Sequence, residues 1–135
     1  MNYLVDANVL SEAIRPAPNP NVTRWLSLHE QKLRVDPIVL GEVHKGILAM
    51  PRGKRRERLE RWFLSTCLKI ECMPWDRAVG LRWGELVNEL ERKGQRIPVV
   101  DGMIAATALT YGLTIATRNV RDFRRAGVEV VNPFE

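Results

Sequence analysis

The sequence is poor in the residues that build disulfide frameworks and zinc sites. It has two cysteines and two histidines, and neither type occurs at the C-x-x-C or H-x-x-x-H spacing of zinc ligands. Two cysteines do not make a disulfide framework, so we expect reduced thiols and a cytoplasmic protein. No apolar run approaches the roughly 18 residues of a membrane span. The first residues also lack the basic and long apolar regions of a secretory signal. From both observations we expect no secretory signal and no association with a membrane.

The residues that are present fit one folded domain over residues 1–135. Hydrophobic residues make up 45% of the chain and charged residues 27%, which is within the globular range. The net charge of +5 favours an anionic partner but is also compatible with solubility alone. Among the 16 acidic residues only five are aspartates, so their positions are informative: Asp6, Asp36, Asp76, Asp101 and Asp122.

Predicted strands alternate with predicted helices along the chain. Short apolar or β-branched runs indicate strands at residues 3–5, 33–35, 68–73, 113–117 and 128–131. Apolar residues at helical spacing indicate helices at residues 9–14 with Asn8 as the cap, and at 22–28, 37–50, 55–67, 76–92 and 98–111. This alternation predicts an α/β fold around a mostly parallel, doubly wound sheet.

Polar side chains follow two of these strands. Asp6 ends the first strand, while Thr117 and Asn119 follow the fourth, with Asp122 just beyond. Open parallel sheets bind ligands outside the carboxyl ends of their strands, so we expect these side chains at one edge of the sheet.

Two further carboxylates lie within helices. Asp101 shares a helix face with Ile104, Ala105 and Ala108, and Glu42 shares one with Val39, Val43 and Gly46. A carboxylate on a core-facing stripe is costly unless a charge or a metal ion accompanies it. Each acid taken alone also has a structural interpretation, as a turn residue, a helix cap or the partner of a surface base.

Together, the four carboxylates Asp6, Glu42, Asp101 and Asp122 favour a metal site. Clustered carboxylates raise one another's pKa unless cations intervene. An all-oxygen ligand set suits Mg²⁺ or Mn²⁺. Such ions activate water and stabilise the leaving oxygen of a phosphodiester.

Four sequence blocks carry a family resemblance. In order they are Leu4–Glu12, Val39–Ile47, Ile97–Ala106 and Thr117–Phe123. They resemble the blocks of PIN-domain nucleases, and more specifically those of the VapC toxins of bacterial VapBC toxin–antitoxin pairs. Any one block is a weak signal, but all four in this order span nearly the whole chain.

The resemblance implies an α/β/α sandwich and a Mg²⁺-dependent endoribonuclease, with Mn²⁺ as a substitute, that cleaves RNA by metal-activated water. It also implies a toxin role, a VapB-like antitoxin and a homodimer. By position, Asp6, Glu42, Asp101 and Asp122 match the catalytic and metal-binding acids. Asn8, Thr117 and Asn119 match supporting polar positions.

The second block departs from the family pattern. Val39 and Asp36 stand where members often have threonine and serine. We interpret Asp36 as the cap of the following helix, or else as an extra acid near the site.

Two clusters of basic residues lie near these blocks. We predict that Arg118, Arg121, Arg124 and Arg125 contact RNA, because phosphate binding is largely neutralisation by Lys and Arg. The segment Arg52–Arg58 is either a solvated helix face or a second RNA contact. The resemblance also implies an antitoxin groove near Trp25, Leu26, Leu28, Leu59 and Phe63.

Other classes fit less well. A haloacid-dehalogenase-type phosphatase needs a second aspartate two residues after the first, where this chain has Asn8, and a receiver domain needs paired acids that the first strand lacks. The alternatives that stay open are a free-standing RNA-processing PIN nuclease and a non-catalytic RNA-binding PIN domain. The second usually loses the acids that this chain keeps.

Overall fold

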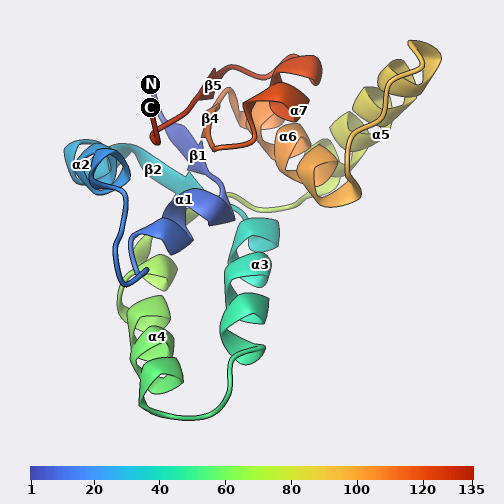
Figure 1. The fold of residues 1–135 in the computed structure, drawn as a ribbon. Helices are drawn as coiled ribbons and strands as arrows, with labels where there is room; N and C mark the ends of the chain where they lie inside the picture. Colours follow the sequence, from blue (N-terminus) through green and yellow to red (C-terminus); the bar gives the residue numbers. More distant parts are fainter.

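The protein forms a five-stranded sheet flanked by helices, in a computed structural model that describes residues 1–135 (Figure 1). Every neighbouring pair of strands is parallel, and the strand order is β3-β2-β1-β4-β5. The predicted α/β fold with a doubly wound parallel sheet is therefore confirmed. The strands are β1 (Tyr3–Val5), β2 (Leu33–Val35), β3 (Glu71–Cys72), β4 (Thr114–Ala116) and β5 (Val130–Val131).

Seven α-helices connect and cover the strands. None of them is long and apolar enough to span a membrane. The helices are α1 (Ala7–Glu12), α2 (Pro20–Leu28), α3 (Pro37–Leu48), α4 (Lys54–Ser65), α5 (Arg77–Arg92), α6 (Val99–Tyr111) and α7 (Val120–Arg125), and two 3₁₀ turns cover Glu30–Lys32 and Cys67–Lys69.

The strand order places a topological switch point between β1 and β4. The chain builds outward from β1 to β2 and β3, then returns to the other side of β1 for β4 and β5. Connections that leave β1 and β4 diverge, and open parallel sheets bind ligands beyond the carboxyl ends of their strands at such a point. The amide of Asp6 donates to the carbonyl of Ala116 at 2.9 Å, so the two strand ends are held together at the switch point.

Aspartates cap three of the helices. Asp6 caps α1, Asp36 caps α3 through the amide of Val39 at 2.9 Å, and Asp76 caps α5. The interpretation of Asp36 as a cap is confirmed. The prediction that Asn8 caps the first helix was wrong, because the helix begins at Ala7 and its capping carboxylate is already at the end of β1.

The third strand is shorter than predicted. Helix α4 ends at Ser65, and a 3₁₀ turn then takes residues 67–69, closed by a hydrogen bond from the amide of Ile70 to the carbonyl of Cys67. Only Glu71 and Cys72 remain to pair with β2, and both are exposed at the sheet edge. The alternating pattern over residues 68–73 therefore indicated a strand but not its length or its place at the edge.

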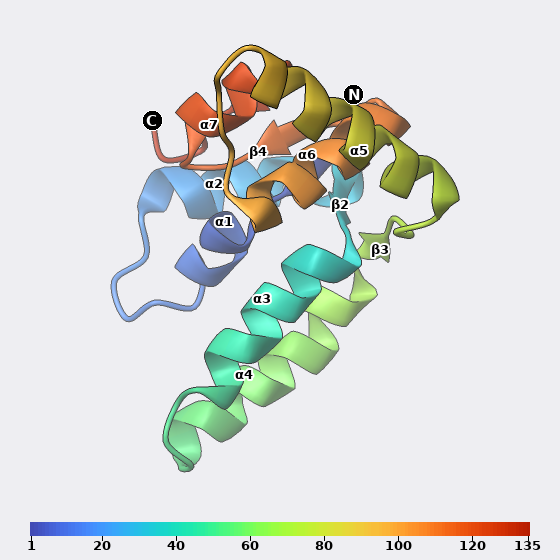
Figure 2. The same ribbon diagram turned by 90° about the vertical axis from the view of Figure 1, so that its right-hand side faces the viewer.

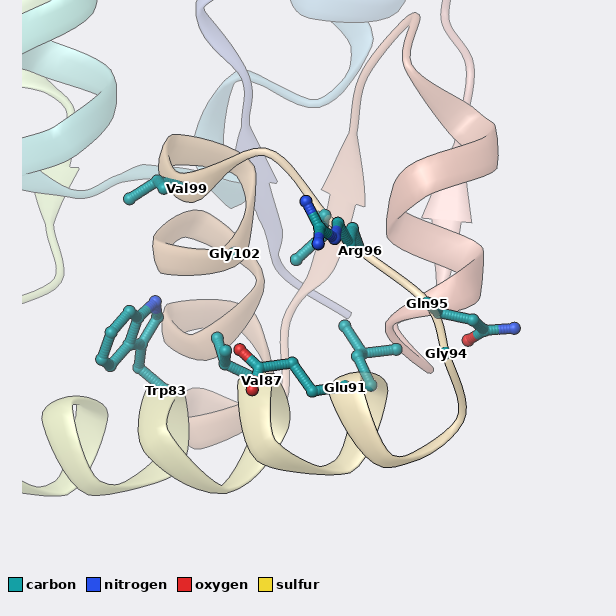
Figure 3. A pocket seen from close by; sticks show the side chains of 10 residues that line it. Trp83, Val87, Glu91, Gly94, Gln95, Arg96, Val99 and Gly102 are labelled. Atoms are coloured by element: carbon teal, nitrogen blue, oxygen red, sulfur yellow. The ribbon is translucent and has the colours of Figure 1, made fainter.

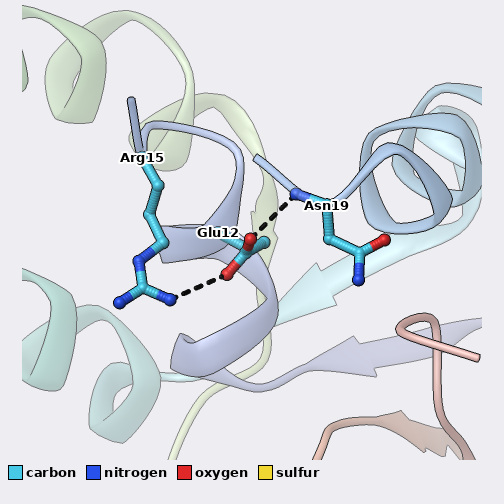
Figure 4. A network of polar contacts seen from close by, with 3 residues as sticks. All are labelled: Glu12, Arg15 and Asn19. Carbon is cyan, nitrogen blue, oxygen red and sulfur yellow. Dashed lines mark hydrogen bonds and ion pairs between the residues drawn. The ribbon is translucent and has the colours of Figure 1, made fainter. Parts of the chain in front are cut away.

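A buried carboxylate fixes the connection between α1 and α2. One oxygen of Glu12 accepts a hydrogen bond from the amide of Asn19 at 2.9 Å, and the other accepts from Arg15 at 3.3 Å (Figure 4). The bond from the Asn19 amide is the main reason that the pKa of Glu12 lies below its usual value. This contact closes the proline-rich segment between Arg15 and Pro20.

Helices α3 and α4 pair into a hairpin that projects from the sheet (Figure 2). Val43 and Ile47 of α3 and Leu59 and Phe63 of α4 are buried, and the ring of His44 stacks on Phe63 with centroids 5.4 Å apart. We name residues 37–65 the α3–α4 arm. The expectation that Leu59 and Phe63 face a partner was wrong, because both side chains belong to the core.

Candidate functional site

Asp6 is the most enclosed carboxylate at the switch point. Its Oδ1 accepts a hydrogen bond from the backbone amide of Ala7 at 2.8 Å. Its Oδ2 accepts from the Thr117 hydroxyl at 2.7 Å and from the side-chain amide of Asn8 at 3.2 Å. The side chain is only 5% exposed. Burial raises the pKa of Asp6 above its usual value, and the three hydrogen bonds oppose this effect without cancelling it.

Thr117 and Asn119 connect Asp6 to two further acids. The Thr117 hydroxyl accepts from the Asn119 backbone amide at 3.0 Å, and the Asn119 side chain donates to Asp101 at 2.9 Å and to Asp122 at 3.1 Å. One hydrogen-bond network therefore joins carboxylates from the end of β1, from α6 and from α7. The structure brings together three of the four predicted acids in this way.

Asp101 lies in the first turn of α6, half-buried. The face it shares with Ile104, Ala105 and Ala108 is packed in the core, as the spacing predicted. Burial raises the pKa of Asp101 to about 6, and the negative charges of Asp6 and Asp122 add to that increase.

Glu42 lies at the open side of the group. We expected its carboxylate on the buried stripe of α3, but that was wrong: Val39, Val43 and Ile47 form the buried stripe, and Glu42 is exposed beside it. Partial desolvation is the main reason that its pKa rises to about 7, with further contributions from Asp6 and Asp101. These contributions identify Glu42 as a neighbour of both aspartates, although no hydrogen bond joins it to them.

Asp36 is a fifth carboxylate behind the site. It is fully buried, and its Oδ2 accepts from the Thr107 hydroxyl at 2.7 Å, which links the start of α3 to α6. Burial raises its pKa, with a smaller contribution from Asp6. Sequence reasoning missed Thr107 because its pairing with Asp36 arises from helix packing, which no spacing along the chain encodes.

No base forms an ion pair with these carboxylates. None of the protein's five ion pairs includes Asp6, Asp36, Glu42, Asp101 or Asp122. No three acidic, histidine or cysteine side chains stand close enough to enclose a metal ion by themselves. Mg²⁺ commonly binds one or two carboxylates and keeps several waters, so an open group of acids still fits this ion.

Two of the predicted RNA-binding arginines lie within the fourth block and two directly follow it. The amide of Arg118 donates to Asn8 at 3.2 Å, and its guanidinium lies 3.8 Å from the centroid of the Phe134 ring. Arg121 and Arg124 on α7 are exposed, whereas Arg125 is half-buried. The structure thus places Arg118 next to the site and three arginines on the adjoining helix.

A hollow of about 780 Å³ lies between α5 and the start of α6 (Figure 3). Trp83, Val87 and Ile97 contribute apolar walls, and Glu91 and Arg96 contribute charged groups. None of the clustered acids lines it, so this hollow is separate from the carboxylate network.

The sequence of the chain matches the family model for the PIN domain over residues 3–129. The chain belongs to the PIN-domain family. This PIN domain is 35% identical to toxin FitB of Neisseria gonorrhoeae, over 97% of each chain. It is 34% identical to VapC ribonuclease Y4jK of Sinorhizobium fredii, over 98% of this chain and 97% of that one. Its fold matches the crystal structure of FitAcB from Neisseria gonorrhoeae with a TM-score of 0.92, at 33% identity over 98% of this chain and 99% of that chain.

Proposed function

We propose that this PIN domain is a metal-dependent endoribonuclease and the toxin of a toxin–antitoxin pair. The observation that carries the proposal is the network in which Thr117 and Asn119 join Asp6 to Asp101 and Asp122 without any basic partner. Such an arrangement keeps like charges close together, which costs stability in the absence of a cation. We therefore infer that this network of carboxylates binds a cation.

The donor set favours Mg²⁺, with Mn²⁺ as a substitute. Asp6 and Asp101 would hold the ion, and Glu42 and Asp122 would complete its surroundings directly or through water. When bound, the ion supplies charge stabilisation and activation of water for phosphodiester hydrolysis. Asn8 and Thr117 fix the orientation of Asp6, and Asn119 fixes Asp101 and Asp122.

The named relatives support the same reaction class and role. One is a VapC ribonuclease and another is a toxin, and both align with nearly the whole chain. We propose RNA as the substrate, with Arg118, Arg121, Arg124 and Arg125 as phosphate contacts beside the site. We also propose a homodimer.

A VapB-like antitoxin is the proposed protein partner. A groove of about 800 Å³ between α1, α2 and α4 is a suitable place for it, because Leu10, Leu26 and Trp62 form apolar parts of its lining. Leu28 at the end of α2 is 73% exposed. An amphipathic segment binds such a surface through its apolar face.

Sequencing of RNA ends after treatment with the purified protein tests the reaction. Hydrolysis by water leaves 5′-phosphate and 3′-hydroxyl ends, and we expect chelation of divalent ions to stop it. Asp6→Asn is the inactive comparison and Glu129→Gln, an exposed acid outside the site, is the matched control. Ends with 2′,3′-cyclic phosphate, or full cleavage after chelation, would refute the proposed chemistry.

Co-expression tests the toxin role. We expect growth arrest on induction of the wild-type protein, and relief of that arrest by the product of a small neighbouring gene encoding a DNA-binding protein. Cleavage without growth arrest would favour the free-standing RNA-processing nuclease.

A further inference from the structure

The outer part of the α3–α4 arm has a large excess of basic residues. Residues 45–61 contain seven basic residues and two acidic ones, a net charge of +5 that equals the net charge of the whole chain. The remaining residues are therefore neutral in sum. A polyanion that approaches this part of the arm therefore meets a local excess of positive charge.

The end of the arm carries bases that the fold does not use. Arg52, Lys54 and Arg55 are exposed and form no ion pair. We name these three residues the basic tip. Arg56 is different, because it pairs with Glu60 at 2.7 Å and donates to the carbonyl of Met50, which closes the turn between the two helices.

Backbone geometry adds to the positive potential of the tip. Helix α4 begins there, and no side chain caps its first amides. The positive end of the helix dipole therefore points to the solvent between the tip residues, and Glu57 in the first turn of α4 offsets part of it. Gly53 precedes the helix with a φ of 156°, a backbone conformation that residues other than glycine rarely adopt, so the turn has a defined shape.

The arm runs directly from the candidate site to the basic tip. Glu42 lies on α3, Lys45 is one turn further along the exposed side, and Lys45 partly offsets the increase in the pKa of Glu42. From Glu42 to Leu48 the helix advances roughly 9 Å, a distance spanned by about three stacked nucleotides of one strand. A Cβ added to Gly46, on this stretch, would meet nothing within 4 Å, so the surface there is open.

We propose that the basic tip binds the phosphate backbone of an RNA strand about three or more nucleotides from the phosphodiester that lies over Asp6 and Asp101. The inference rests on the proposed ribonuclease function and adds a second contact region to it. An acidic protein segment is the other polyanion that could bind here. RNA is favoured because the tip and Glu42 belong to one helical hairpin, so a strand that crosses the acids can also reach the tip.

The salt dependence of RNA binding tests this proposal. The probe is a fluorescein-labelled 20-nucleotide RNA of mixed sequence, and binding is followed by anisotropy from low to moderate KCl. All proteins carry Asp101→Asn so that no cleavage occurs. The test variant adds Arg52→Gln, Lys54→Gln and Arg55→Gln. The matched control instead adds Lys32→Gln, Arg77→Gln and Arg92→Gln, three exposed bases outside the arm that form no ion pair.

We expect the tip variant to lower the slope of log K against log [KCl] by about 2, because each single-strand phosphate contact contributes about 0.7. The control should keep the slope of the parent protein. Equal slopes for the tip and control variants would overturn the proposal, and so would an unchanged RNA slope with weakened antitoxin binding. Failure of the ribonuclease function appears separately, as absence of cleavage by the wild-type protein.

Discussion

The sheet edge and the arm both hold like charges together, but they do so by different means. At the edge, Asp6, Asp101 and Asp122 are fixed by hydrogen bonds from Thr117 and Asn119 and are partly or fully removed from solvent. At the basic tip, Arg52, Lys54 and Arg55 stand in water without partners. Fixed, desolvated charges suit an ion that needs defined ligands, whereas exposed, solvated charges suit a flexible polyanion.

The largest expected effect is the loss of RNA cleavage when a carboxylate at the sheet edge is replaced. Asp101→Asn should lower the single-turnover rate of RNA cleavage at least about 100-fold, because an electrostatic contribution of about 3 kcal/mol corresponds to that factor. Glu129→Gln should leave the rate unchanged. A rate within about tenfold of the wild type for Asp101→Asn would show that this carboxylate is not essential.

Mg²⁺ binding at the sheet edge should raise the melting temperature of the protein. Mg²⁺ at ten times its dissociation constant adds about 1.4 kcal/mol, which raises the melting temperature of a chain of this length by about 5 °C. Asp101→Asn should lose most of this increase. NaCl at matched ionic strength is the control, because it screens repulsion without specific binding, and an equal increase with NaCl would argue against a metal site.

The pH dependence of stability should report the repulsion at the edge. In the metal-free protein the pKa of Glu42 is about 7 and that of Asp101 about 6, against ordinary values of 4.5 and 3.8. Between the unfolded and folded values the native state binds more protons, so the free energy of unfolding should rise as the pH falls from about 8 to about 5. Urea titrations at several pH values measure this dependence.

Glu42→Gln is the matched variant for the pH experiment, and its stability should vary less over the same range. The trend should reverse at lower pH, where Glu12 and Asp76, whose pKa values are lowered in the fold, become protonated. Stability that falls steadily from pH 8 to pH 5 would contradict the assignment of a repulsive acidic cluster.

The smallest effect is expected at the basic tip. Neutralising Arg52, Lys54 and Arg55 together should change the free energy of unfolding by no more than about 0.5 kcal/mol, because the three side chains support no contact of the fold. Arg56→Gln removes an ion pair and a hydrogen bond and should cost about 0.5 to 1 kcal/mol. A larger loss in the tip variant than in Arg56→Gln would give the tip a structural role.

Helices and strands could be predicted from the sequence where one physical effect dominated the local pattern of residues. Buried parallel strands produce short apolar runs, so β1, β2 and β4 could be located. Helix α6 ends at Gly112 in the left-handed conformation, which glycine adopts more readily than other residues. The length of β3 could not be predicted, because the edge strand is cut short by a 3₁₀ turn whose stability depends on its surroundings.

The sequence by itself determined that Asp6 and Thr117 end parallel strands, because alternating helices and strands force such ends to one edge of a sheet. Only the tertiary structure decided the strand order that makes β1 and β4 neighbours. It also decided the exposure of Glu42, the burial of Asp36 against Thr107 and the projection of the basic tip. These features depend on how helices pack across the sheet, and packing is set by contacts between residues far apart in the chain.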